Sequence, residues 1–136
     1  MNMKDERQFV GYSKYRSRLV DGHVHTELCP HGSGDRTALM IEKAIELRIE
    51  KVCLTEHAPL PKAFAAEYGG DQKAYDTASL KLNQVDSYLE LGRQLQRAYG
   101  THIDISLGFE VDYIPGFEAD IQEFLDRYGP LTDDNI

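Results

Sequence analysis

The 136-residue sequence predicts an α/β fold in which parallel strands alternate with helices. Three short segments have strand-like alternation, and each is followed by a segment whose apolar residues recur at helical spacing. Each predicted strand also ends in a histidine or is followed within two residues by a histidine or glutamate. Helices of this size between strands imply parallel strands joined by right-handed crossovers. In such folds, reactive side chains collect beyond the carboxyl ends of the strands.

The predicted elements follow the order β-α-β-α-β-α. Their approximate ranges are 18–25 (strand), 37–48 (helix), 51–55 (strand), 78–99 (helix), 102–109 (strand) and 117–128 (helix). Gly100 and Gly129-Pro130 are natural helix ends. The segment 58–75 contains prolines and two adjacent glycines, so it is predicted to be a long loop, with a lid as one interpretation. Residues 1–16, polar and of mixed charge, are expected to form a leader before a domain at 17–136.

Composition limits the classes of partner. The formal charge of −8 argues against a general nucleic-acid or membrane-surface binder, since both need a basic surface. An anionic substrate stays open, because bound divalent ions reverse the local charge. There is no apolar run of membrane-spanning length and no signal-like leader. Two cysteines make no disulfide framework, so the expected location is the reducing cytoplasm.

His23 and His25 lie in the first predicted strand. Alternate side chains of a strand share one face and lie about 6.6 Å apart, so the two imidazoles can bind one cation of the zinc or manganese type. A polar strand face without a metal is the alternative. His31, His57 and Glu110 follow in the sequence, and a chain with five histidines rarely gathers such a set by chance.

Three further candidates have alternatives of their own. His57 falls on the same strand face as Cys53 and Thr55. Its alternative to metal binding is a role in orienting a loop or a helix. His31 lies in a loop, where no periodicity can be checked, and could be an exposed loop residue. Cys29 could be a thiolate ligand, but a buried or incidental thiol is the simpler interpretation.

Glu110 offers a different chemistry. Its two oxygens can bridge two cations about 3.5–4 Å apart, although a surface carboxylate is the alternative. Asp112, at the same parity, could orient a ligand from outside the metal shell or cap the turn before Pro115. His102 also shares this parity but precedes Glu110 by a distance of roughly 26 Å along an extended strand. We therefore expect His102 at the opposite end, outside the site.

The motifs around these residues resemble those of the PHP (polymerase and histidinol phosphatase) superfamily, and most closely its histidinol-phosphatase branch. They are Asp21-Gly22-His23-Val24-His25-Thr26, Cys29-Pro30-His31-Gly32, Thr55-Glu56-His57-Ala58-Pro59 and Gly108-Phe109-Glu110-Val111-Asp112-Tyr113. The resemblance covers residues 19 to 136. It implies a distorted (β/α)7 barrel of TIM-like type, with helices outside the strands and up to three metal ions at the carboxyl-end face.

The resemblance also implies a set of ligands and a reaction. His23 and His25 would hold one metal, Glu110 would bridge it to a second, and His31 and His57 would hold a third. Zinc is the expected cofactor, with manganese or iron as alternatives, and no catalytic residue is expected apart from the metal ligands. The implied reaction is hydrolysis of L-histidinol phosphate to histidinol and phosphate in histidine biosynthesis. Phosphoryl transfer mainly needs positioning and charge neutralisation, which metal ions supply.

Three strands cannot close a seven-stranded barrel. Residues 17–136 are therefore expected to be the N-terminal half of a PHP domain, incomplete at its C-terminus and weakly active or inactive alone. One alternative is a non-catalytic metal-binding module, completed by a partner chain or by self-association through exposed sheet edges. Another is a PHP phosphoesterase of different specificity. The expected partner is a small phosphorylated substrate, with no nucleic acid and no membrane.

Overall fold

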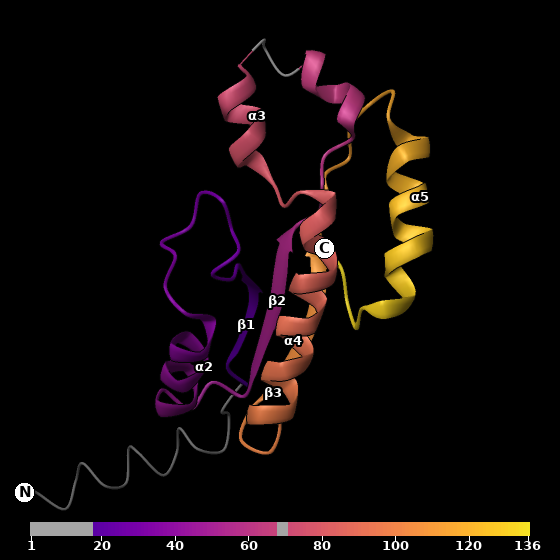
Figure 1. Cartoon of the computed structure of the whole chain (residues 1–136). Helices are drawn as coiled ribbons and strands as arrows, with labels where there is room; N and C mark the ends of the chain where they lie inside the picture. Colours follow the sequence, from indigo (N-terminus) through magenta and orange to yellow (C-terminus); the bar gives the residue numbers. More distant parts are fainter. Residues whose placement is uncertain (1–17, 68–70) are drawn as a thin grey trace, which may run out of the picture.

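A parallel three-stranded sheet forms the centre of the protein (Figure 1). The computed structural model describes residues 18–67 and 71–136, so the predicted leader at 1–16 lies outside the described residues. The strands are β1 (Val20–Val24), β2 (Lys51–His57) and β3 (Asp104–Glu110), in the spatial order β1-β2-β3. Both strand pairs are parallel, which confirms the predicted α/β class.

The register between β2 and β3 is unbroken. It runs from Lys51 opposite Asp104 to His57 opposite Glu110, so the last residues of the two strands are level. The pairing of β1 with β2 shifts in register between Asp21 and Val24. Strand β2 lies between two partners and extends to His57, two residues beyond its predicted end.

Helices follow the strands as expected. Those of the described residues are α2 (Thr37–Glu46), α3 (Gln72–Ala78), α4 (Val85–Tyr99) and α5 (Glu118–Tyr128), with short 3-10 helices at Lys62–Glu67, Leu82–Gln84 and Gly129–Leu131. None of the described helices has the length and apolar character that crossing a membrane requires.

Helix α4 packs very closely on β3. A methyl group added at Gly92 would lie 2.4 Å from Cδ1 of the fully buried Leu107, so only glycine permits this approach. The buried Tyr88 hydroxyl donates to the carbonyl of Gly108 at 2.6 Å and accepts from the Glu56 backbone N–H at 3.3 Å. Burial raises the pKa of Tyr88 well above its ordinary value, which keeps this donor protonated.

The prediction of a long loop over 58–75 was wrong for the parts of this segment that form helices. The segment contains the 3-10 helix Lys62–Glu67 and the start of α3, and the long helix expected from residue 78 begins only at Val85. Asp71 caps α3, because its side chain accepts the Ala74 N–H at 2.9 Å. Ser79 then takes an extended conformation and ends the helix.

Residues 133–136 lie alongside β3. The Asp133 N–H donates to the carbonyl of Leu107 at 2.7 Å, and the Ile136 N–H donates to that of Phe109 at 2.9 Å. The bonds advance in the same direction along both segments, so residues 133–136 run parallel to β3. Gly108 allows this approach, since a methyl group there would overlap the carbonyl oxygen of Asp134.

Candidate metal centre

The five predicted ligand residues meet at one edge of the sheet. His23 lies in β1 and His25 directly after it, while His57 and Glu110 end β2 and β3 opposite each other. Because the strands are parallel, their carboxyl ends share this edge. The site therefore gathers segments separated by up to 87 residues in sequence.

His23, His25 and Glu110 form the first donor group. Nε2 of each histidine lies 3.0 Å from Oε2 of Glu110, and the two Nε2 atoms lie 3.2 Å apart. A tetrahedral zinc ion with bonds of about 2.0–2.1 Å separates its ligands by about 3.4 Å. The spacing of these three donor atoms thus fits a single divalent cation.

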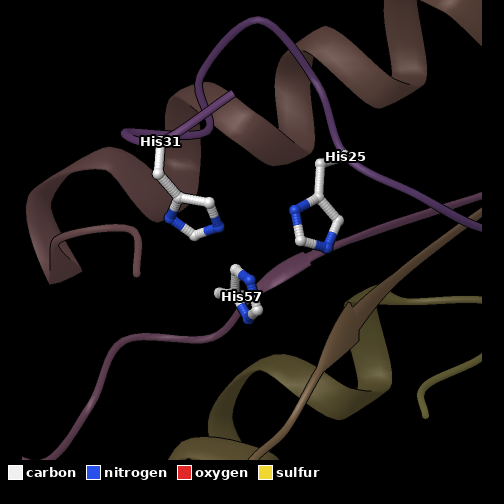
Figure 2. Close-up of side chains that lie close together, drawn as sticks. All are labelled: His25, His31 and His57. Atoms are coloured by element: carbon white, nitrogen blue, oxygen red, sulfur yellow. The ribbon is translucent and has the colours of Figure 1, made fainter. Parts of the chain in front are cut away.

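His25, His31 and His57 form the second group, and Figure 2 shows their rings turned toward a common space. Ring centroids lie 4.4 Å apart for His25 and His57 and 5.0 Å apart for His31 and His57. One nitrogen from each ring lies within 4.8 Å of the other two. His25 belongs to both groups, so the two candidate sites are adjacent.

Helix α3 orients His31. Nδ1 of His31 lies 2.7 Å from the carbonyl oxygen of Thr77, which is next to the last residue of the helix. A carbonyl only accepts hydrogen bonds, so Nδ1 carries the proton. The last carbonyls of a helix lack partners within it, and this bond satisfies one of them. Nε2 of His31 is left to face the other histidines.

The surroundings of His57 favour its neutral form, and those of Glu110 favour its ionised form. Nδ1 of His57 lies 3.1 Å from Oε2 of Glu110, yet makes no hydrogen bond within the described part of the chain. Burial lowers the pKa of His57, against the opposing charge of Glu110, and so favours neutral imidazole. Burial alone would raise the pKa of Glu110, but hydrogen bonds from His23 and His25 and the charge of His57 lower it overall. Neutral imidazole and ionised carboxylate are the metal-binding forms.

Cys29 and Glu56 lie beneath this edge. Cys29 is 6% exposed, and burial raises the pKa of its thiol, which favours the buried-thiol interpretation over a thiolate ligand. Glu56 is completely buried, and burial raises the pKa of its carboxyl group. Its carboxylate accepts the Thr26 backbone N–H and, at 3.3 Å, the Thr26 hydroxyl.

Glu56 was predicted from the sequence only as a member of the Thr55-Glu56-His57-Ala58-Pro59 motif, with no role of its own. The available signal was its parity with Val52 and Leu54, which places it on the buried face of an apolar strand. Charged residues are almost never fully buried without a partner, so this parity marks Glu56 as a special residue.

Asp112 lies near the carboxyl ends of the strands, and His102 lies near their amino ends. Asp112 is exposed and, with His31 and His57, lines a hollow of about 640 Å³ beside the second donor group. His102 lies with Arg18 and Glu50 near the starts of β2 and β3, as expected. The structure therefore brings together His23, His25, His31, His57 and Glu110, places Asp112 next to them, and leaves His102 at the far end.

Comparisons with known proteins match most of the chain. The model of the PHP domain family matches residues 21–132. Histidinol-phosphatase of Bacillus subtilis is 41% identical over 116 residues, covering 85% of this chain and 41% of that protein. A Deinococcus radiodurans protein named probable histidinol-phosphatase is 27% identical over 110 residues, covering 81% of this chain and 38% of that protein.

A solved structure shows the same fold. It is the crystal structure of a candidate histidinol phosphatase from Listeria monocytogenes, with a TM-score of 0.82 and 41% identity. The match covers 85% of this chain and 43% of the Listeria chain. The chain thus spans about two fifths of the length of the relatives it matches.

Proposed function

This chain belongs to the PHP domain family, and from that premise we propose that it acts in metal-dependent hydrolysis of L-histidinol phosphate to histidinol and phosphate. The observation that carries the proposal is the convergence of four histidines and Glu110 at one sheet edge. The names of its relatives support the phosphate monoester substrate and a role in histidine biosynthesis. Free Cys29 and Cys53 agree with a reducing, cytoplasmic setting.

His23, His25 and Glu110 would hold one metal ion, Glu110 would also hold a second, and His31 and His57 would hold a third, beside the ring of His25. Zinc is the first choice, since imidazole and carboxylate suit it, and manganese or iron are the alternatives. Bound divalent cations supply charge neutralisation for a phosphate ester and lower the pKa of water at the site.

Side chains of the protein would hold the bound cations and orient the phosphate ester. Oε2 of Glu110 lies between the two donor groups, within 3.0–3.1 Å of nitrogens from His23, His25 and His57. The hollow lined by His31, His57 and Asp112 is the proposed entrance for the phosphate ester. Asp112, which lines the same hollow, would orient a ligand from outside the metal shell.

A non-catalytic metal-binding module is the second candidate. It is favoured by the position of β1 at the edge of the described sheet. Val20 in this strand is 52% exposed, and an edge of this kind can pair with another chain or a second copy. Such a module would bind metal without releasing phosphate.

The two candidates are separated by measuring metal content and phosphate release on the same preparations. The chain is dialysed against zinc or manganese, and released phosphate is assayed with L-histidinol phosphate and with unrelated phosphate monoesters. His57→Ala should lose both metal and activity, while His102→Ala, at the far end of the sheet, should lose neither. Metal binding without phosphate release from any ester would favour the module, and hydrolysis of the unrelated esters alone would favour another specificity. Absence of bound metal would contradict both.

A further inference from the structure

His25 lies at the junction of the two donor groups. Its Nε2 is 3.0 Å from Oε2 of Glu110 and 3.2 Å from Nε2 of His23. Its ring centroid is also 4.4 Å from that of His57. The orientation and tautomer of this one ring therefore affect both groups.

The other ring nitrogen of His25 faces a buried sulfur. Nδ1 lies 3.4 Å from Sγ of Cys29. A neutral imidazole carries a single N–H, so an Nε2 that offers its lone pair to a cation requires the proton on Nδ1. Nδ1 then needs an acceptor, and in metal sites this is usually a carboxylate, a carbonyl or water. Here the atom in place is a thiol sulfur, which is a weak acceptor.

The main chain holds Cys29 in position. Its N–H donates to the carbonyl of Thr26 at 3.1 Å, and its own carbonyl accepts the Gly32 N–H at 3.2 Å. A methyl group on Gly32 would lie 3.1 Å from Cβ of Cys29, so the turn is tight. Because these bonds do not involve the side chain, a small residue at position 29 can keep the same turn.

Glu56 provides an independent observation. Its side chain is completely buried, and its Oε2 has no hydrogen-bond partner among the residues that the structure describes. One Glu56 carboxylate oxygen, Sγ of Cys29 and a nitrogen of His25 lie within 4.8 Å of one another. A thiol can donate its own proton while its sulfur accepts another. Sγ of Cys29 thus lies near both the Glu56 carboxylate and the His25 ring.

We propose that Cys29 and Glu56 are positioning residues for the metal centre. In this arrangement Glu56 accepts the S–H of Cys29, the sulfur accepts Nδ1–H of His25, and Nε2 of His25 is left to face the cation. Each hydrogen stays on its donor, so no proton is transferred. The inference rests on the proposed metal-dependent function. The competing arrangement, in which Cys29 is itself a metal ligand, is one outcome of the test.

The test compares Cys29→Ala and Cys29→Ser with the matched control Cys53→Ala. Nitrogen-15 NMR of the zinc-loaded chain reports the Nδ1–H of His25. We expect this proton to be protected from exchange with water in the wild type, in Cys29→Ser, whose hydroxyl can also accept, and in Cys53→Ala, but to exchange faster in Cys29→Ala. Zinc affinity, measured by competition with a chelator, should fall about 10–100-fold in Cys29→Ala alone, the usual effect of removing an outer partner of a metal-binding histidine.

Glu56→Gln keeps the size of the side chain and tests the second half of the arrangement. Its amide oxygen can still accept from Thr26, but its NH₂ cannot accept the thiol proton, so the His25 Nδ1–H of the zinc-loaded chain should exchange faster with water. This variant also carries the test if Cys29→Ala fails to fold.

Two results would overturn the proposal. One is an unchanged exchange rate of the His25 Nδ1–H and unchanged zinc affinity in Cys29→Ala. The other is a sulfur-to-cobalt charge-transfer band in the cobalt-loaded wild type, which would make Cys29 a ligand. Both readouts need zinc but no substrate, so their result is independent of whether the chain is a phosphatase.

Discussion

Oε2 of Glu110 faces three imidazole nitrogens, at 3.0 Å from His23, 3.0 Å from His25 and 3.1 Å from His57. Partial burial of this cluster removes solvent that would otherwise screen it. A shared cation would account for these short nitrogen–oxygen distances, because neutral imidazole and ionised carboxylate both bind metal without a proton between them. The chemistry of the site therefore depends on single atoms at the ends of three different strands.

The first prediction concerns His25, which belongs to both donor groups. His25→Ala should release more bound zinc per chain than His31→Ala, because His31 contributes to one group only. Removal of either ligand should weaken zinc binding at its own group by at least ~10-fold, the lower end of the effect of losing an outer partner. Metal analysis after dialysis measures the content, with His102→Ala as the control. Equal losses from His25→Ala and His31→Ala would contradict the shared role of His25.

At the scale of elements, α3 connects the segment after β2 to the metal centre. Its C-terminal carbonyl at Thr77 accepts the hydrogen bond that orients His31. The sequence did not indicate this helix, because it is only seven residues long, has no buried residues and follows two adjacent glycines. Its start depends on the local bond from Ala74 to the Asp71 side chain, which apolar periodicity cannot reveal.

The second prediction follows from that cap. Asp71→Ala should destabilise α3 by about 1 kcal/mol, the usual cost of losing an N-cap, and should weaken zinc binding through His31. Hydrogen exchange of the α3 amides and zinc affinity are the two measurements. Lys73→Ala, an exposed change in the same helix, is the control and should leave zinc affinity unaltered. Faster exchange in α3 with unchanged zinc affinity would show that the helix does not position His31.

At the scale of the whole molecule, the parallel sheet, its helices and the match to the Listeria structure confirm the expected part of a TIM-like barrel. Asp133 connects the C-terminal segment to this framework. Its Oδ2 accepts from the Leu107 N–H at 3.0 Å and from the Gln96 side chain at 2.7 Å, and lies 3.2 Å from Arg93. One carboxylate thus joins α4, β3 and residues 133–136.

The third prediction tests this junction. Asp133→Ala removes a charged acceptor from several donors and should lower the free energy of unfolding by about 1–3 kcal/mol. Chemical denaturation measures the loss, and Asp134→Ala is the neighbouring control, since its exposed side chain takes no part in these three contacts. A loss in Asp134→Ala as large as in Asp133→Ala would assign the effect to the backbone segment instead of the carboxylate.

The alternation of strands and helices, the parallel sheet and the residues gathered at its edge were all predictable from the amino-acid sequence. These features follow from local rules, because the spacing of apolar side chains and the length of each helix depend on residues that are close in sequence. The rise per residue of a strand, which places His102 roughly 26 Å from Glu110, is a rule of the same kind.

The contacts among the gathered residues became known from the three-dimensional structure alone. The sharing of His25 between two groups, the bond from His31 to α3, and the burial of Glu56 beside Cys29 join residues far apart in the chain. Such contacts depend on strand register and on side-chain direction in three dimensions, which no local pattern encodes.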